Sequence, residues 1–588
     1  MSRSALLFTV TAFLFGGLSL TAFLGSVISY EEVLSYLNSI APDGDVESYS
    51  SLRHELFHIR LRYASAGFGL IAMGMAFVSS HIKPKQGHPR SSSVQFFMDM
   101  REAIWRWYRG TAAWVKICIA VLCCGAALLR GMMLLEPITY DEAFTWTYYA
   151  SRPLHVALAD YSYPNNHILH TLFVKGSTVL FGVSLVPLRL PAFVASLVAL
   201  PLFYLFVRST FGRHVALLSL TLVVADGSLV EYSALARGYS ITWLCMITAF
   251  MLMRYFLRTA NLFSACMIGT VCGLGMWSVP TMLYPALLVH LWAFLLILFK
   301  GVDRVEHQIQ RLLLSFLVLV AIALLLYSPV LVLYGPGQIT AHPELIPPSW
   351  ATMSAELGTT VMGTWEHFTD PVPVILVFAG ILACCWAVYA SMNFRLLAVA
   401  LVLATVPVVL LQRAVAPARA WLFILFIMHI GGAIGLLHFL KALSGALSFR
   451  YGLAPWVIAA AFLVFAAFAR SGMPAIVDRQ LRFSEAATIA NWLHQRLRPG
   501  DRVYTMFPWD APVEFHAVGI GTERTYYHLP PSAGRQIFFL EVPDQGIAVS
   551  KMLDHHKVDP IGGGGLVFME GIGRTKIFMA QFGDVHSR

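Results

Sequence analysis

Long apolar runs recur along the chain and predict helices that cross a membrane. Each run holds about 20 residues, the length that a helix needs to span a hydrocarbon core of about 30 Å. The runs lie at roughly 5–29, 62–80, 112–134, 186–207, 214–230, 238–257, 262–279, 281–299, 312–334, 373–391, 395–412, 420–440 and 453–470. The pattern predicts an α-helical polytopic membrane protein with about 13 transmembrane helices.

The pattern changes after Arg470, where polar and charged residues become frequent. Ser484 can cap a helix there. The apolar face of that helix consists of Ile489, Trp492, Leu493 and Leu497. Apolar stretches at 503–507, 536–542 and 566–569 favour strands. We therefore expect a small α/β domain over residues 471–588.

The distribution of Lys and Arg sets the expected orientation, because cytoplasmic loops of membrane proteins collect basic residues. With the N-terminus in the cytoplasm, the basic residues on that side are Lys83, Lys85, Arg90, Arg101, Arg106, Arg109, Arg208, Arg213, Arg254, Arg258, Lys300, Arg304, Arg311, Lys441 and Arg450. The segments on the outer side are then 135–185, 231–237, 335–372 and 471–588. The stretch 167–181 must not cross, and we expect it to be a helix in the interface plane.

Composition changes this picture little. The chain has 588 residues, of which 57% are hydrophobic and 12% charged. The net charge of +9 does not point to nucleic acid, because basic cytoplasmic loops account for it. The eight cysteines lie inside apolar runs, so we expect neither disulfides nor a thiolate metal site. The segment 5–30 is longer than the apolar part of a signal peptide, and we expect it to be retained.

The first outer segment contains two groups of polar residues. Asp141 and Glu142 are adjacent carboxylates at a membrane face, where such groups are costly to desolvate and often functional. A solvated helix terminus is the alternative interpretation. Asn166 and His167 follow in a turn-forming stretch, and His167 suits a hydrogen bond to a phosphate or a carboxylate. An amphipathic side chain at headgroup level is the alternative there.

Two further outer stretches carry charge. The turn from Glu231 to Tyr239 offers a carboxylate and, at Arg237, a guanidinium that suits a phosphate. Its alternative is a Glu–Arg pair among tyrosines of the aromatic belt. Arg413 and Arg419 run against the positive-inside bias and suit an anionic head group, or they snorkel to ordinary phospholipid. A carboxylate together with guanidinium groups is what group transfer from a phosphate leaving group requires.

The order of these motifs resembles the GT-C superfamily of glycosyltransferases, in particular the bacterial branch similar to protein O-mannosyltransferases and the aminoarabinose transferase of lipid A. The motifs lie within residues 112–440 and are Asp141-Glu142-Ala143-Phe144-Thr145, Pro164-Asn165-Asn166-His167, Leu188-Arg189-Leu190-Pro191-Ala192, Phe211-Gly212-Arg213, Glu231-Tyr232-Ser233 and Ala236-Arg237-Gly238-Tyr239. The resemblance implies many transmembrane helices with interfacial helices in the first outer loop. It also implies a polyprenyl-phosphate sugar as donor and inversion at the anomeric carbon.

The resemblance assigns expected roles to individual residues. Asp141 matches the acid of the first loop and is the expected general base. The other expected catalytic residues are Glu142 and Glu231. The residues expected to bind the donor phosphate are Arg237, Arg413, Arg419 and His167, and those expected to bind substrate are Asn166, Tyr232 and Tyr239. Ile168 stands where the family usually has a proline, which leaves the start of the interfacial helix open.

The resulting expectation is a glycosyltransferase of the bacterial inner membrane that acts in the cell envelope. Residues 1–111 would add two spans and a basic loop, 112–470 would form the transmembrane catalytic domain, and 471–588 an extracytoplasmic domain. The acceptor is a glycan, a lipid or a protein. The sequence identifies no cofactor with certainty and leaves a divalent cation open. The rival interpretation is a transporter or flippase for a lipid-linked glycan, against which stands the lack of an internal repeat. A structural scaffold would not explain the charged outer segments.

Overall fold

The computed structural model describes residues 3–40, 50–81, 92–163, 165–299, 305–337, 349–370, 372–446, 458, 482–528, 535–556 and 566–581. Apart from one residue, the predicted span 453–470 lies outside these ranges. Pro164 and part of the predicted outer segment 335–372 also lie outside them.

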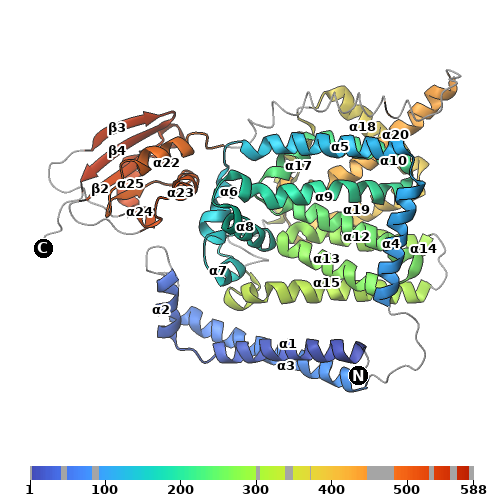
Figure 1. The fold of residues 1–588 in the computed structure, drawn as a ribbon, viewed down its shortest axis with the longest axis horizontal. Coiled ribbons are helices and arrows are strands. Elements are labelled where there is room, and N and C mark those ends of the chain that lie inside the picture. Colours follow the sequence, from blue (N-terminus) through green and yellow to red (C-terminus); the bar gives the residue numbers. More distant parts are fainter. Residues whose placement is uncertain are drawn as a thin grey trace.

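Helices make up most of the described chain (Figure 1). The long ones are α1 (Arg3–Gly25), α2 (Tyr30–Ile40), α3 (Ser51–His81), α4 (Ser92–Gly110), α5 (Ala113–Met132), α9 (Leu185–Phe211), α10 (Arg213–Ala225), α12 (Tyr239–Thr259), α13 (Leu262–Ser278), α14 (Leu283–Phe299), α15 (Val305–Leu333), α17 (Trp350–Thr369), α18 (Val374–Ala390), α19 (Met392–Gln412) and α20 (Phe423–Ala446). Every predicted span in the described ranges coincides with one or more of these helices.

The number of spans is smaller than the sequence predicts. Within the described ranges, seven helices are long and apolar enough to cross a membrane, or up to ten if each of three bent pairs counts as one span. The multi-pass helical class is therefore confirmed, whereas the count of 13 is not reached. The bent pairs and the shorter apolar helix α13, which has 17 residues, account for much of the difference.

One predicted turn is instead a helix. The sequence predicts a turn at residues 231–237, but α11 (Gly227–Ala234) carries Glu231 and Tyr232 and buries both. The chain bends earlier, by 63° between α10 and α11. Asp226 caps α11 there, since its Oδ1 accepts a hydrogen bond of 2.9 Å from the backbone N–H of Leu229. The capping residue explains the new helix start.

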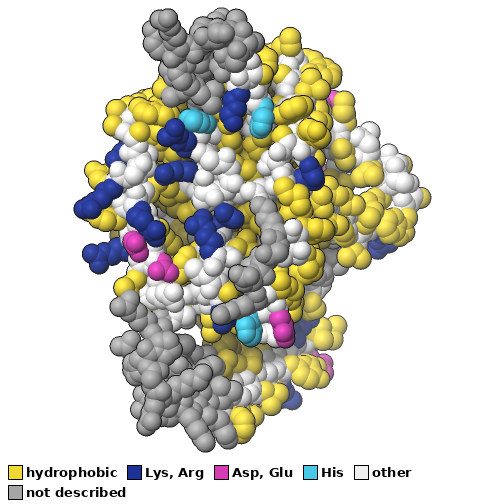
Figure 2. All heavy atoms as spheres, turned by 90° about the vertical axis from the view of Figure 1, so that its right-hand side faces the viewer, with side chains coloured by type: hydrophobic (Ala, Val, Ile, Leu, Met, Phe, Trp, Pro, Cys, Tyr) yellow, Lys and Arg dark blue, Asp and Glu magenta, His cyan; other side chains and the backbone are white. Residues whose placement is uncertain are grey.

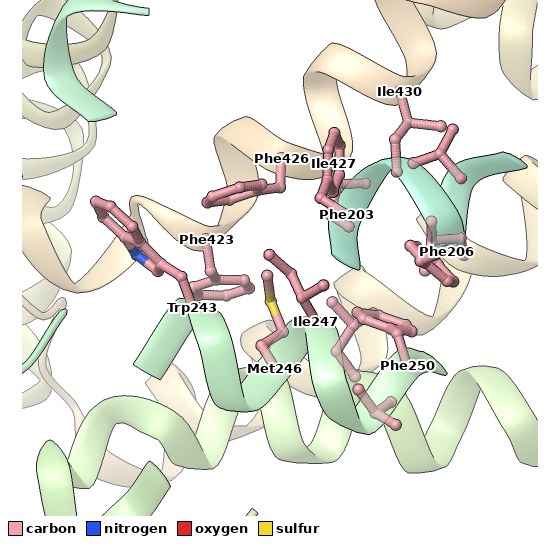
Figure 3. Packing of buried hydrophobic residues seen from close by; sticks show 14 of the residues in the cluster. Phe203, Phe206, Trp243, Met246, Ile247, Phe250, Phe423, Phe426, Ile427 and Ile430 are labelled. Atoms are coloured by element: carbon pink, nitrogen blue, oxygen red, sulfur yellow. The ribbon is translucent and has the colours of Figure 1, made fainter. Parts of the chain in front are cut away.

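The core of the helical bundle is built by α9, α12 and α20 (Figure 3). Aromatic rings from these helices interlock, for example Phe203 with Phe426 at 5.3 Å and Phe206 with Phe250 at 4.8 Å between ring centroids. Trp243 adds a contact of 5.7 Å to Phe426. Because lipid tails are as apolar as leucine, this close packing rather than the hydrophobic effect holds the spans together.

One end of the bundle is basic. Figure 1 shows α4 lying across the end of the bundle on the right, roughly perpendicular to the long helices, and Figure 2 views that end. Lys and Arg side chains spread over this face, while acidic side chains are few. Exposed basic residues of α4 include Arg101, Arg106 and Arg109. Such a face is typical of the cytoplasmic side of a membrane protein.

Short helices gather at the opposite end of the bundle (Figure 1). They are η1 (Met133–Leu135), α6 (Tyr140–Phe144), η2 (Thr145–Ala150), α7 (Leu154–Ala159), α8 (Ile168–Phe181) and, before α20, η5 (Ala418–Trp421). With 14 residues, α8 is about 21 Å long, shorter than a hydrocarbon core of about 30 Å. Its length agrees with the expectation that this stretch does not cross, and its position in the interface stays a prediction.

The C-terminal part forms a small α/β unit. Its strands β1 (Arg502–Tyr504), β2 (Gln536–Glu541), β3 (Val567–Ile572) and β4 (Thr575–Gln581) form a sheet of order β1-β2-β4-β3. Strand β1 is parallel to β2, and the other pairs are antiparallel. Its helices are α22 (Ala486–His494), α23 (Asp510–Gly519), α24 (Thr525–His528) and α25 (Val549–His556). Two further short 3₁₀ helices in the described chain are η3 (Pro280–Met282) and η6 (Pro543–Gln545).

The sequence finds three of these strands and the helix at 486–494 but misses β4. The Gly562–Gly565 run lies outside the described ranges. The helix begins slightly later than a cap at Ser484 would give, with Glu485 as its N-cap. Of the expected apolar face, Ile489 and Leu493 are fully buried.

The α/β unit packs directly on the short helices at the end of the bundle. Both share one hydrophobic cluster, in which Trp146 of η2 meets Phe515 of α23 at 5.6 Å between ring centroids. Arg524 ties them further, because its Nη1 donates to Ser151 Oγ at 2.9 Å and its Nη2 to the carbonyl of Thr147 at 2.8 Å. The unit therefore helps to fix the position of the first loop.

A close approach of two spans gives a test of this packing. Gly269 of α13 lies against α15, and a Cβ at this position would come within 2.8 Å of Val318. Gly269→Leu should therefore force the helices apart and destabilise the protein by about 1–3 kcal/mol, as overpacking does. Thermal unfolding in detergent measures the loss. Gly67→Leu on α3 is the matched control, since a Cβ there would meet nothing within 4 Å. An equal loss from both variants would contradict a tight contact at Gly269.

Candidate functional site

A buried ion pair supports the first loop. Glu142 of α6 and Arg189 of α9 are both fully buried. They form a two-point pair, with Nε to Oε1 and Nη2 to Oε2 both at 2.7 Å. The backbone N–H of Ala236 also donates to Oε1 at 2.8 Å, and Thr139 donates to Oε2 through its N–H at 3.0 Å and its hydroxyl at 3.1 Å. Glu142 thus caps its own helix and joins three segments of the chain.

Arg189 completes this arrangement on its other side. Its guanidinium donates to the carbonyls of Met133, Leu134, Glu136 and Pro137 at 2.6–3.2 Å. Free carbonyls at the end of η1 would otherwise be left without donors in an apolar setting, which is costly. In the sequence, Arg189 stands out only as part of a motif. Its burial could not be foreseen from its place near the start of an apolar run.

The charge of Glu142 is maintained by its partners. Burial by itself would raise the pKa of this carboxyl. The charge and hydrogen bonds of Arg189, together with the N–H groups of Ala236 and Thr139, outweigh burial and hold the pKa below its usual value. Because its oxygens are already engaged, these contacts favour a positioning role for Glu142. The expected catalytic role stays a prediction.

Asp141, the preceding residue, faces the opposite way and is 41% exposed. Its Oδ2 lies 3.2 Å from Nη1 of Arg237 and 3.9 Å from Nη1 of Arg419. Asn165 donates to the backbone carbonyl of Asp141 at 3.3 Å, and so does the hydroxyl of Thr145 at 2.8 Å. The structure therefore brings together three residues that the sequence singles out in three distant segments.

Arg237 is buried, and some of its N–H groups have no hydrogen-bond acceptor in the described chain. Its Nε and Nη1 donate no hydrogen bond to any described residue, although Nη1 lies near Asp141. Buried guanidinium donors without acceptors are costly, so the site suits an additional anion. Arg419 lies on the same side, and its pKa is raised: burial lowers it, but Tyr239, Asp141 and Tyr232 outweigh burial. Two permanent positive charges thus surround one carboxylate.

His167 lines the same region in its neutral form. Burial is the largest cause that lowers its pKa well below the usual range, and Arg237, His170 and Arg419 lower it further. Its Nδ1 accepts a hydrogen bond of 2.8 Å from the backbone N–H of Gly238, so the proton of the neutral ring resides on Nε2. The ring meets Tyr239 edge-on at 5.3 Å. His167 therefore offers a donor without a charge.

The three remaining expected residues on this side have different surroundings. The Asn166 amide is fully engaged, donating to the carbonyls of Ala157 and Asp160 at 3.0 and 2.7 Å and accepting from Thr171 at 2.9 Å. Tyr232 meets Tyr239 edge-on at 5.7 Å, which continues the aromatic contacts of His167. Glu231 is buried in α11, and its expected catalytic role stays a prediction.

Arg413, which the sequence predicts to bind phosphate, is not in the charged group around Asp141. It ends α19 with a positive φ of 52° and is partly buried. Within the described ranges, no ion pair links it to Asp141, unlike Arg237 and Arg419. Its expected role in phosphate binding stays a prediction.

Apolar cavities lie near the arginines. A cavity of 430 Å³ between α17, α19 and α20 reaches Val415 and Trp421, close to Arg419 along the chain. A second cavity of 560 Å³ between α17, α18 and α20 shares Trp365, Phe368 and Met428 with the first. Both are lined mainly by apolar side chains, and the first reaches η5 at Trp421.

The surroundings of Asp141 do not resemble a metal site. Its charged neighbours are arginines, which repel a cation. In the part of the chain that the structure describes, no group of three or more His, Cys, Asp or Glu residues is arranged to hold a metal ion. These residues do not fit a divalent cation, and the positive charge beside Asp141 comes from Arg237 and Arg419.

Known structures share this arrangement of helices. ArnT from Cupriavidus metallidurans bound to undecaprenyl phosphate has a TM-score of 0.52 at 14% identity, over 80% of this chain and 98% of that one. The apo form of ArnT gives 0.51 at 13% identity, over 79% and 97%. The oligosaccharyltransferase AglB from Archaeoglobus fulgidus is more distant, with a TM-score of 0.44 at 14% identity over 72% and 65%. A comparison with curated proteins gives no match.

The chain shares the fold of the two ArnT structures, and this likeness agrees with the resemblance to GT-C glycosyltransferases found in the sequence. Within this class, residues 165–333 match the family model described as dolichyl-phosphate-mannose-protein mannosyltransferase. The matched stretch begins at Asn165 and includes His167, Arg189 and Arg237.

The buried pair gives the second test. Glu142→Gln removes the negative charge beside Arg189 and leaves a buried cation, which should destabilise the protein by about 3–5 kcal/mol. Thermal unfolding measures this loss. The matched control is Glu102→Gln on α4, because the pair of Glu102 with Arg106 is 64% and 71% exposed and contributes little. If both variants unfold at the wild-type temperature, Glu142 does not hold the loop.

Proposed function

We propose that the protein is a membrane glycosyltransferase that moves a sugar from a polyprenyl-phosphate donor to an acceptor on the extracytoplasmic face. The observation that carries the proposal is the partly exposed carboxylate of Asp141 between two guanidinium groups, one of which, Arg419, lies two residues from Trp421 in the wall of the 430 Å³ apolar cavity. It combines a base, a site for phosphate and room for a long lipid tail.

The proposed reaction is a single displacement with inversion. Asp141 takes the proton of an acceptor hydroxyl or amine as the acceptor attacks the anomeric carbon. The bond between that carbon and the phosphate oxygen breaks, and its electron pair leaves with the polyprenyl phosphate. Arg237 and Arg419 stabilise the added negative charge, with the Nε2–H of His167 as a further donor.

Donor binding would also change the contact between Asp141 and Arg237. In the structure, Nη1 of Arg237 lies 3.2 Å from Oδ2 of Asp141. A phosphate that takes the donors of Arg237 competes with Asp141 for this partner. Asp141 is then released toward the acceptor when the donor is in place, which orders the two substrates.

The other expected residues receive supporting roles in this proposal. Glu142 holds α6 so that Asp141 faces the site, and Asn166 joins α7 to the start of α8. Tyr232 and Tyr239 offer aromatic and hydroxyl contacts near Arg419, where a donor sugar would lie. Glu231 stays a candidate for a catalytic or structural carboxylate behind them, and Arg413 for a third contact with phosphate.

The proposed location is the inner membrane of a bacterium. The basic face at the α4 end favours the cytoplasmic side for that end, so the site and residues 471–588 would lie outside. In this orientation residues 112–470 form the catalytic unit and residues 1–111 an additional hairpin. The lipid tail of the donor would enter the 560 Å³ apolar cavity from the bilayer.

The first functional test removes the proposed base. Asp141→Asn keeps the shape of the side chain but should lower transfer by about 10²–10⁴-fold. Mass spectrometry of polyprenyl-phosphate sugars and envelope glycans in cells lacking the protein identifies the donor that accumulates and the glycan that loses a sugar. Turnover of purified variants is then measured with those substrates.

The matched control for this variant is Asp544→Asn, at an exposed aspartate of the C-terminal unit. It should restore the missing sugar in cells, whereas Asp141→Asn should not. More than about a tenth of wild-type turnover in Asp141→Asn would exceed what loss of a general base allows and would rule out the assignment.

The second functional test concerns the phosphate. Arg237→Lys and Arg419→Lys keep the charge but lose the two-point geometry of a guanidinium, so the KM for the donor should rise about tenfold or more with the acceptor KM nearly unchanged. Arg496→Lys, at an exposed arginine, is the control. Unchanged donor kinetics in both variants would mean that Arg413 or another group binds the phosphate.

A specific observation favours a flippase as the second candidate. The α10–α11 pair is a broken span, and Asp226 at the break lies 2.9 Å from His429 Nε2 beside the 560 Å³ cavity. In cells lacking a flippase, the lipid-linked sugar stays on the cytoplasmic leaflet. In cells lacking a transferase it accumulates on the outer leaflet, where impermeant periodate oxidises it.

A further inference from the structure

Aromatic rings connect the C-terminal unit to the candidate base. Tyr140 directly precedes Asp141, and its ring meets Phe507, just before α23, at 4.7 Å and 80°. On its other side Tyr140 meets Phe144 at 5.7 Å. Phe144 is buried and carries Tyr148 stacked at 4.0 Å and Tyr163 edge-on at 5.5 Å. The cluster therefore spans both units beside Asp141.

Two of these rings are left open to solvent. Phe507 is 69% exposed and Tyr163 is 48% exposed. Large aromatic side chains at such positions gain little packing free energy in the free protein. Their faces suit the apolar C–H face of a pyranose ring, and the hydroxyl of Tyr163 suits a hydrogen bond to a polar substituent of such a ring.

A polar group accompanies the rings. Asp510 begins α23, three residues after Phe507, and its Oδ1 is buried without a hydrogen-bond partner among the described residues. Burial raises the pKa of this carboxyl to about 6, although the backbone N–H groups of Asp510 and Ala511 lower it. Asp510 is also close enough to raise the pKa of Tyr140 and Tyr148, for which burial is the larger cause. Arg152 adds a buried Nε without an acceptor in the described chain.

The neighbouring Glu514 is already engaged. Arg524 Nε donates to its Oε1 at 2.6 Å, and His528 Nε2 lies 3.0 Å from its Oε2. Arg524 in turn contacts Ser151 and Thr147 of the first loop. These groups hold the junction together. Among the described charged groups named here, Asp510 Oδ1 and Arg152 Nε are the atoms that keep no hydrogen-bond partner.

We propose that Tyr140, Tyr163, Phe507 and Asp510 form the acceptor subsite and that it takes a sugar ring, so the acceptor is a glycan. The ring would rest on the faces of Phe507 and Tyr163, and its hydroxyls would meet Asp510 and Tyr140. An adjacent hydroxyl of the same acceptor would then reach Asp141. This inference rests on the proposed function and adds the acceptor class.

Binding of simple sugars to the full-length protein in detergent tests the subsite. The probes are methyl glycosides of a hexose, a hexosamine and a uronic acid, together with a hexose 6-phosphate and a serine-threonine peptide, observed by saturation-transfer NMR. Wild type should bind one or more methyl glycosides. Phe507→Ala should weaken that binding about tenfold, as loss of an aromatic contact does. Asp510→Asn should weaken it about tenfold as well.

The matched control is Phe568→Ala, because Phe568 lies on β3 of the same unit and is 57% exposed. Its glycoside binding should equal that of wild type. Undecaprenyl phosphate binding is measured on the same samples and should be unchanged in Phe507→Ala. The subsite is overturned if no glycoside binds to wild type, if only the peptide binds, or if Phe507→Ala binds glycosides as wild type does.

The two proposals fail in different ways. Normal undecaprenyl phosphate binding with unaltered glycoside binding in Phe507→Ala rejects the subsite alone. Loss of sugar transfer in Asp141→Asn would still support the transferase. Conversely, glycoside binding that depends on Phe507, with full transfer by Asp141→Asn, rejects the proposed base and keeps the subsite.

Discussion

The ion pair of Glu142 with Arg189 is the interaction on which the geometry of the site depends. Removing two charges from water is costly, and only a two-point pair with additional donors offsets this cost. The pair meets the condition through Ala236, Thr139 and the carbonyls that follow α5. Successive residues of a helix are about 100° apart, so Glu142 in the interior turns its neighbour Asp141 outward.

The charges around Asp141 are unequal in number, and this imbalance favours an anionic ligand. One carboxylate lies between two guanidinium groups, and Arg237 retains donors without acceptors in the described chain. His167 adds a hydrogen-bond donor but no charge, because burial and the nearby arginines keep its ring neutral. Arg237 itself is buried, where a charge interacts more strongly than it does at a surface.

The sequence predicts the class of fold and the candidate site residues, but not the contacts that hold those residues in place. Apolar runs locate the helices because burial in lipid requires long uninterrupted apolar stretches. Asp141, Arg237 and Arg419 stand out in the sequence because charge at a membrane face is costly, and the structure brings the three side chains together. The α10–α11 bend is missed because a helix cap at Asp226 does not stand out within an apolar run. The role of Arg189 is missed because its partners lie up to 56 residues away along the chain. The aromatic junction is missed for the same reason.

The bond from Arg524 to the carbonyl of Thr147 joins residues 377 positions apart. At a synthesis rate of about 5–20 residues per second, the second partner emerges roughly 20–75 s after the first. During this interval the spans insert, yet η2 lacks the arginine that holds it and the cluster around Phe515 is incomplete. The final shape of the first loop is therefore acquired late in biosynthesis, after the spans that surround it have been made.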